Sequence, residues 1–424
     1  MTTCGICGDS SELEWGYTTV RSATGRATMQ CATCWKRRRE RRELAIVAVP
    51  FALLVALALL GGEWRSALPT IRIYPVLLIV LWAHELGHAL VGRAVGLRVI
   101  EVVLGSGPRL ARVRVGETDV EVRLLPFGGH SVMVPLEPSR ARLAVGVLAG
   151  PLANLVVVVV TIFVWPRSGP WVAPLVIANS LVLVGNLWPM KVATPLGPVR
   201  SDGLALLTLI RSPADELREM DALRYAAETA AALERRDLAA AVRHAERGLA
   251  AHPIDAVLRH FLTVALIRDG RFDTARAHLQ TLLASDGIEP HQRAIDLNNL
   301  AWANLMSGDA ALLDEALAAS EEAERKIAWH PAVKGTRGYA LILTGRVDEG
   351  LARARRAHAA HSAKTDRATT ACVLAIGTAR LGDFAGARAM LDAARRLDPD
   401  GDLLRRADAE LLPYLGAGTH RHGA

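Results

Sequence analysis

Two histidines and a glutamate lie close together in the sequence Ala83-His84-Glu85-Leu86-Gly87-His88. On a helix, residues four apart share one face, so the imidazoles of His84 and His88 could both reach one metal ion. Glu85, one step round the helix, would then be placed to accept a proton from a water molecule at that metal. The spacing therefore predicts a metal-dependent hydrolase.

The residues around this motif have the composition of a membrane span, because 75–97 is almost continuously apolar. Ionisable side chains inside such a segment are costly and usually have a function. We therefore expect the active site to lie within the membrane.

A third metal ligand must come from elsewhere in the chain. Glu101, Glu117 and Glu121 are available, but they lie in a stretch predicted to form β-structure. Asp202 follows the segment Asn186-Leu-Trp-Pro189, which predicts a broken helix at the cytoplasmic end of another span. Because both spans run toward the cytoplasm, Asp202 is better placed to meet the two histidines.

The N-terminal head, residues 1–40, contains Cys4-Gly-Ile-Cys7 and Cys31-Ala-Thr-Cys34. Four thiolates at this doubled spacing suit a structural Zn²⁺ and predict a zinc-ribbon-like fold. A head this small could not bury enough apolar surface to fold without the metal. Two disulfides or a redox pair are the alternative.

Four apolar segments, at about 44–61, 75–97, 143–165 and 171–189, predict membrane spans within a core of residues 41–212. Six cations in residues 36–42 precede the first span and indicate that its start is cytoplasmic. Between the second and third spans, residues 98–138 alternate polar and apolar residues with glycine-rich breaks, which predicts a small β-region.

Residues 213–424 contain a short repeated segment, typified by Gly270-Arg-Phe-Asp-Thr-Ala275. Its copies begin at positions 236, 270, 308, 345 and 382, which lie 34–38 residues apart. This period and the small-residue signature are typical of tetratricopeptide helix pairs. An ordinary helical bundle is the alternative.

The 424-residue chain is therefore predicted to be mainly α-helical: a polytopic membrane core of about four spans, a small membrane-associated β-region, an N-terminal zinc ribbon and C-terminal helical repeats. The formal charge of +7 is modest, and much of the basic excess flanks apolar spans. Charge alone does not favour nucleic-acid binding.

Over residues 75–210 the sequence resembles the site-2 protease family of intramembrane zinc metalloproteases. The resemblance rests on motifs that occur in family order: His84-Glu85-x-x-His88, Pro126-Phe-Gly-Gly129, Ala149-Gly-Pro-Leu-Ala-Asn154, Asn186-Leu-Trp-Pro189 and Asp202-Gly203. It implies a catalytic zinc held by His84, His88 and Asp202, in addition to the structural zinc of the head, with Glu85 as general base.

The resemblance also implies a multi-pass protein of the cell membrane that cleaves transmembrane segments of other membrane proteins. Asn186, Asn154, Gly128 and Gly129 would then contact the substrate or the oxyanion, and the β-region would present substrate as an extended strand. We expect the head and the repeats to be cytoplasmic, and the repeats to be able to bind a cytoplasmic protein partner.

The sequence departs from the family at two places. Residues 191–200 are inserted before Asp202, and the sequence does not determine how they affect its position. His130 stands where the family has a large apolar or aromatic residue; a satisfied surface histidine is the favoured interpretation, and a pH-sensitive or metal-blocking group is the alternative.

Two other functions remain open. One is a membrane-anchored scaffold with a silent protease core, although a scaffold gains nothing from burying His, Glu and Asp groups. The other is a membrane-tethered metalloprotease that acts on soluble or misfolded proteins, with a glutamate as third ligand.

Overall fold

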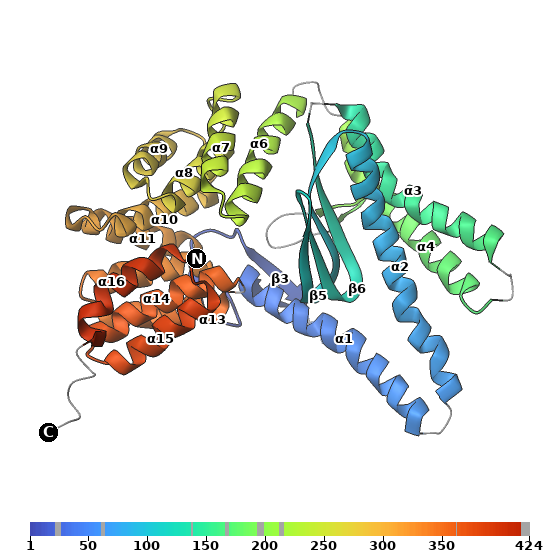
Figure 1. Ribbon diagram of the computed structural model, residues 1–424, viewed down its shortest axis with the longest axis horizontal. Coiled ribbons are helices and arrows are strands. Elements are labelled where there is room, and N and C mark those ends of the chain that lie inside the picture. Colours follow the sequence, from blue (N-terminus) through green and yellow to red (C-terminus); the bar gives the residue numbers. More distant parts are fainter. Residues whose placement is uncertain are drawn as a thin grey trace. The chain divides into compact units, whose positions relative to one another are not determined.

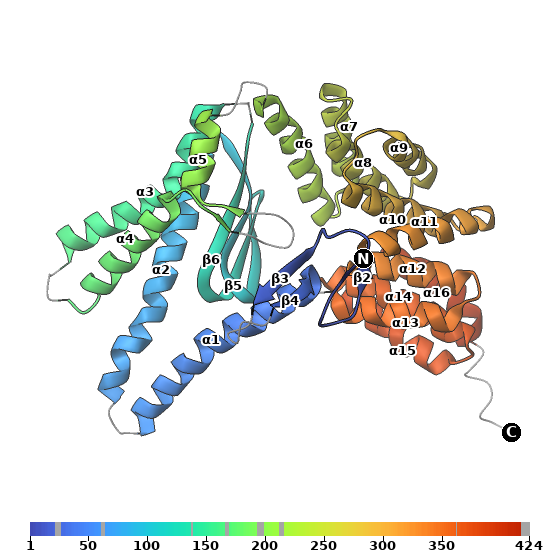
Figure 2. The same cartoon turned by 180° about the vertical axis from the view of Figure 1, so that it is seen from behind.

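The computed structural model describes residues 1–21, 27–60, 64–136, 139–165, 169–192, 199–211, 216–361 and 363–416. Internal contacts divide the chain into two compact units (Figures 1 and 2). One unit combines Met1–Trp35 with Ala232–Ala424, and the other is Lys36–Ala231. The predicted boundaries at 40/41 and 212/213 remain predictions.

The head consists of two small antiparallel hairpins. Strand β1 (Thr2–Thr3) pairs with β2 (Ser10–Ser11), and β3 (Tyr17–Arg21) pairs with β4 (Ala27–Cys31). Helix α1 (Ala32–Leu60) follows β4 directly. The first cysteine pair lies between β1 and β2, and the second lies at the junction of β4 and α1, so the hairpins bring the two pairs together.

The second unit is built on helix α2 (Trp64–Ala94), which packs along α3 (Arg140–Val164). Helix α4 (Val172–Leu187) packs on α3, and so does the short helix α5 (Asp202–Arg211). Helix α2 ends earlier than the predicted position 97, because Gly96 adopts a φ of +83° that ends the helix in a left-handed turn.

Among the described residues, two helical segments are long and apolar enough to cross a membrane, Ile71–Ala94 and Arg140–Val164. Helix α4 is apolar but shorter, with 16 residues. Most side chains of the first predicted span, 44–61, lie outside the described residues. The prediction of four spans therefore remains a prediction.

The predicted β-region is present as two long strands, β5 (Leu97–Val115) and β6 (Thr118–Pro135), which pack against α2. Both strands bend, so residues 101–104 pair with 129–132 on one side and with 119–122 on the other. Gly105 permits the bend in β5, because it has a φ of +99° and a Cβ there would lie 2.4 Å from the carbonyl oxygen of Leu125. This arrangement places the strand 129–135 beside the histidine-bearing helix.

The rest of the chain is helical, and its elements follow the predicted repeats. The helices are α6 (Glu216–Glu234), α7 (Leu238–Ala251), α8 (Ala256–Arg268), α9 (Phe272–Ala284), α10 (Pro290–Ser307), α11 (Leu313–Ile327), α12 (Pro331–Leu343), α13 (Val347–Ala360), α14 (Lys364–Arg380), α15 (Phe384–Leu397) and α16 (Asp402–Gly416), with a 3-10 turn, η1 (Ala310–Leu312), before α11.

Each copy of the repeated sequence segment begins in a turn between two helices. Its leading residue has a positive φ in all five copies: Arg236, Gly270, Gly308, Gly345 and Gly382. A small residue in the following helix is buried in every copy, so the next helix can approach closely. It lies five positions later in four copies, for example Ala275 and Ala387 at 0% exposure, and eight positions later, at Ala316, in the copy that begins at Gly308. The repeated sequence segment therefore encodes a turn between two helices and a small residue at the contact between packed helices.

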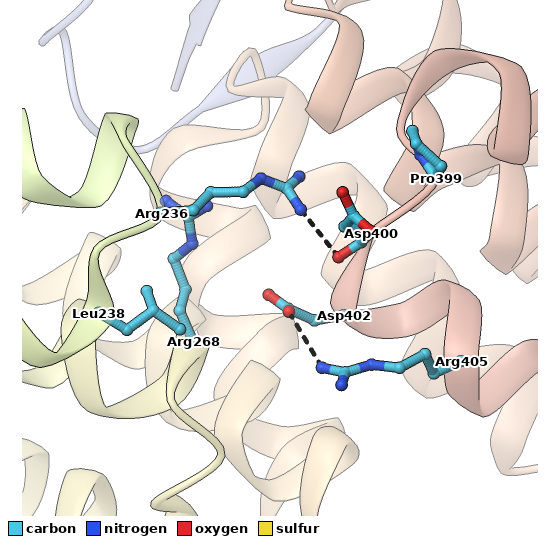
Figure 3. Close-up of a pocket in the computed structure, with 7 residues that line it drawn as sticks. All are labelled: Arg236, Leu238, Arg268, Pro399, Asp400, Asp402 and Arg405. Atoms are coloured by element: carbon cyan, nitrogen blue, oxygen red, sulfur yellow. Dashed lines mark hydrogen bonds and ion pairs between the residues drawn. The ribbon is translucent and has the colours of Figure 1, made fainter.

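From α8 to α15 each helix pair packs on the next pair along the chain, as in a solenoid rather than an ordinary bundle. The two ends of the repeat region also touch, because the Arg236 guanidinium donates to the Asp400 carbonyl oxygen at 2.8 Å and pairs with the Asp398 carboxylate. A pocket of about 280 Å³ lies at this junction (Figure 3). Among its lining side chains, Arg405 pairs with Asp402 at 3.7 Å, and Arg236 and Arg268 donate to backbone carbonyl oxygens.

Candidate metal centre

The side chains of His84, His88 and Asp202 converge on one point within the second unit. His84 Nε2 lies 3.1 Å from Asp202 Oδ2 and 3.2 Å from His88 Nε2, and the third side of this triangle is 3.6 Å. Both histidines are buried, at 5% exposure. Helix α2 supplies the histidines, and the first residue of α5 supplies the carboxylate.

The outer nitrogen of each histidine ring is fixed by a hydrogen bond. His84 Nδ1 lies 2.7 Å from Asn154 Oδ1, and His88 Nδ1 lies 2.8 Å from the carbonyl oxygen of Gly146. Both partners are acceptors, so each Nδ1 carries the proton and each Nε2 presents a lone pair to the centre.

Three electron pairs therefore face one another, and the Asp202 oxygen among them has no hydrogen-bond partner within the described chain. Such an arrangement is repulsive unless a cation lies between the atoms. Two ligands about 2.05 Å from a tetrahedral zinc are about 3.3 Å apart, which matches the three sides of this triangle. The residues fit a zinc ion that keeps a fourth position open.

Glycines on the facing helix make room for the histidines. A Cβ at Gly150 of α3 would lie 2.2 Å from His88 Nε2, the atom that points to the centre. A Cβ at Gly87 of α2 would lie 2.7 Å from the carbonyl oxygen of Ala149. Gly150 thus leaves space for the His88 ring, and Gly87 allows α2 to pack closely on α3.

Glu85 is buried beside this group and contacts the β-region. The Ser131 hydroxyl donates to Glu85 Oε2 at 2.8 Å, and a Cβ at Gly129 would lie 2.7 Å from Glu85 Oε1. The absence of a side chain at Gly129 therefore leaves space at one carboxylate oxygen while Ser131 holds the other. Ser131 is a functional residue that the motifs do not predict; the one signal for it in the sequence is its place two residues after Gly129.

The inserted segment 191–200 does not displace Asp202. Its ends form two short antiparallel strands of two residues each, β7 (Lys191–Val192) and β8 (Val199–Arg200), which pair with each other. Ser201 closes the hairpin: its hydroxyl donates to the carbonyl oxygen of Trp188 at 2.7 Å and accepts from the backbone N–H of Met190 at 3.1 Å. The two ends of the insertion are thus held together, and Asp202 begins α5 two residues after β8.

The four residues expected at the substrate lie in different surroundings. Gly129 lies against Glu85, whereas Gly128 has a φ of +67° and open space around it. Asn154 is fully buried and binds His84. Asn186 is half-buried and donates to the carbonyl oxygen of Val182. Their predicted contacts with substrate or oxyanion remain predictions.

The alternative glutamate ligands do not join the histidines. Glu117 pairs with Arg98 at 3.1 Å, and Glu121 pairs with Arg123 at 2.7 Å. Glu101 lies 3.6 Å from His130, so His130 faces a carboxylate rather than the centre. This pairing lowers the pKa of Glu101 and raises the pKa of His130.

A second potential metal site lies in the head, where sulfur atoms of Cys4, Cys7, Cys31 and Cys34 all lie within 4.8 Å of one another. All four cysteines are free thiols, so the disulfide alternative is not observed. Burial raises the pKa of the Cys34 thiol to about 12, so a metal would have to displace its proton.

The chain is similar to proteins that are named as zinc metalloproteases or as proteases. It is 46% identical over 55 residues to one from Clostridium perfringens, a stretch that covers 13% of this chain and 16% of that protein. It is 33% identical over 75 residues to the regulator of sigma-W protease RasP of Bacillus subtilis, covering 18% of each. The chain thus spans less than a fifth of the length of these two relatives.

The chain is also similar to a solved tetratricopeptide-repeat protein of Thermus thermophilus. The two are 22% identical, and the match covers 45% of this chain and 99% of that protein, with a TM-score of 0.37. The model of peptidase family M50 matches residues 73–382, more than half of the sequence and both ligand-bearing helices. With the two histidines, the glutamate and the aspartate in place within that match, the chain belongs to peptidase family M50.

Proposed function

We propose that this protein is an intramembrane zinc metalloprotease that hydrolyses peptide bonds in or near transmembrane segments of other membrane proteins. The observation that carries the proposal is that His84, His88 and Asp202 converge beside Glu85. The two histidines and Glu85 lie on a helix that is long and apolar enough to cross a membrane. The names of the relatives, which give a zinc metalloprotease in one case and a protease in the other, support the reaction class.

Glu85 and Ser131 would have different roles in the reaction. When bound, zinc would polarise the scissile carbonyl and lower the pKa of water to about 7. Glu85 would take a proton from the attacking water and deliver it to the departing amine. The Ser131 hydroxyl would hold Glu85 Oε2, so that the oxygen beside Gly129 is the one directed to the reaction.

The strand 129–135 is the proposed guide for substrate. In the described part of the chain it pairs along one edge only, with residues 97–104, and it passes Glu85 at Ser131. A peptide bond inside a helix is shielded by its own hydrogen bonds, so substrate must unwind before it is cut. An added strand along the open edge would supply the lost backbone hydrogen bonds.

We also propose that the protein is a multi-pass protein of the cell membrane and that the head and repeats are cytoplasmic. The cations in residues 36–42 motivate this orientation. The repeats would bind a cytoplasmic protein in a hollow of about 410 Å³, whose lining includes Asn298, Trp302 and Thr336. Accessibility of engineered cysteines to a membrane-impermeant reagent from each side tests the orientation.

Cleavage by the purified full chain in detergent tests the reaction, with a fusion protein that carries one transmembrane segment as substrate. We expect Glu85→Gln to abolish cleavage and keep the metal, and Asp202→Ala to lose both cleavage and one zinc per chain. The matched control is Glu117→Gln, which changes a carboxylate outside the centre and should retain both. Zinc loss in the control but not in Asp202→Ala would overturn the assignment of the third ligand.

A membrane-tethered protease for soluble chains is the second candidate, because the strand edge could also accept an unfolded soluble segment. Cleavage of an unfolded soluble protein at a rate equal to that of the membrane fusion would favour it. Unchanged biological activity of Glu85→Gln would instead favour a scaffold.

A further inference from the structure

The head and the repeats, although they come from opposite ends of the sequence, share an extensive interface within one unit. Helix α11 ends at Ile327 and α12 begins at Pro331, and the head lies on the turn between them. The backbone N–H groups of Glu12 and Leu13 donate to the carbonyl oxygens of Arg325 and Lys326, at 3.0 and 3.3 Å. The head thereby satisfies carbonyl groups that the end of α11 leaves without helical partners.

Trp329 is the centre of this interface. It is 5% exposed, and its indole N–H donates to the carbonyl oxygen of Trp15 at 3.0 Å. The ring packs in one cluster with Cys4, Cys31 and Ala32, so two of the predicted metal ligands contact the repeat domain directly. Gly16 lies so close that a Cβ there would be 2.1 Å from the ring.

A buried ion pair links the metal-binding loop to α12. The Asp9 carboxylate pairs with the Lys334 ammonium, and their side chains are 10% and 9% exposed. Asp9 follows Cys7 by two residues, in the loop that carries the first cysteine pair. The backbone N–H of Cys4 donates to the carbonyl oxygen of Asp9 at 2.9 Å, so the position of Asp9 depends on the fold of the loop around the cysteines.

We propose that the metal held by the four cysteines supports an internal docking surface, so that metal loading of the head controls whether residues 1–35 remain seated on α11 and α12. A head of this size has little core of its own, and its folding is coupled to metal binding. Without metal, the loop that positions Asp9 and the sulfur cluster that covers Trp329 lose their support.

This docking has a structural consequence for the chain. The chain leaves the first unit at Trp35 and returns to it at Ala232. A seated head therefore holds both ends of the intervening segment in one unit, and release of the metal would free the start of α1 from the repeats.

Hydrogen exchange of the full chain in detergent, with measured zinc content, tests the proposal without any reference to proteolysis. Cys7→Ser/Cys34→Ser should lose one zinc and increase exchange in α12 by on the order of tenfold, while α15 in the same unit stays unchanged. His88→Ala should lose the other zinc and leave α12 protected.

A charge swap provides a test that leaves the cysteines intact. Lys334→Glu should raise exchange in α12 with zinc retained, because it places a second carboxylate against Asp9. The double variant Asp9→Lys/Lys334→Glu should restore protection. Unchanged α12 exchange in the cysteine variant after its zinc is lost would overturn the proposal. An equal rise in α15 would also overturn it, because that result would indicate general unfolding rather than undocking.

Discussion

Replacement of Asn154 by alanine is expected to weaken the metal centre without removing a metal ligand. The Asn154 side chain is fully buried, and it binds His84 Nδ1 at 2.7 Å, the Val80 carbonyl oxygen at 3.0 Å and Asn179 Oδ1 at 2.8 Å. The alanine variant leaves the His84 N–H and the Asn179 oxygen without these partners. Each unsatisfied buried group costs about 1–3 kcal/mol.

The same change frees the His84 ring, whose orientation presents Nε2 to the metal. Loss of a hydrogen bond behind a metal-binding histidine typically reduces metal affinity about 10–100-fold. This factor corresponds to about 1.4–2.7 kcal/mol. We therefore expect Asn154→Ala to lower both zinc affinity at the core site and thermal stability.

Asn154→Asp separates these two effects. Its carboxylate still accepts from His84 Nδ1 but can no longer donate to Val80 and Asn179, so stability should fall while zinc affinity is retained. Competition with a chromophoric chelator measures the affinity, and the cysteine site of the head serves as an internal reference. If Asn154→Ala bound core zinc within twofold of the unmodified chain, the reasoning about His84 would be wrong.

Two further changes test the space and the contacts around the centre. Gly150→Ala should remove the core zinc, because the new Cβ would lie 2.2 Å from His88 Nε2. Gly185→Ala should keep the core zinc, because Gly185 has open space around it. Measurement of the zinc content of both variants tests this expectation. Ser131→Ala should lower kcat for the fusion substrate about tenfold with zinc content unchanged, because the hydrogen bond from the Ser131 hydroxyl to the Glu85 carboxylate is lost. Ser131→Thr should recover most of the rate. An unaltered kcat in the alanine variant would exclude a positioning role for this hydroxyl.

The position of Asp202 after the inserted segment 191–200 could not be predicted from the sequence. The interval between Asn186 and Asp202 leaves the position of the carboxylate open when only spacing is considered. In the structure, the pairing of β7 with β8 joins the ends of the insertion, and the Ser201 hydroxyl adds hydrogen bonds to the backbone of Trp188 and Met190. A hydrogen bond between residues 188 and 201 has no periodic signature, so no pattern in the sequence could predict it.

The repeats illustrate the opposite case. The recurring segment predicts a turn and a close helix contact, and the structure has both at each copy, including the copy at Arg236, where a non-glycine residue adopts a positive φ. Local backbone geometry and burial of a small residue depend on neighbours along the chain. They can therefore be predicted from the sequence.

The chemistry available to this protein can be predicted from the sequence: the His-Glu-x-x-His helix, the cysteine pairs, the β-region and the resemblance to site-2 proteases, which the M50 match confirms. Spacing within one element fixes which side chains share a face, so these features need no tertiary information. Three contacts are visible in the fold alone: Asp202 rather than a glutamate meets the histidines, Ser131 holds Glu85, and the head lies on Trp329. These contacts join residues 46 to more than 300 positions apart, and they depend on how whole elements pack.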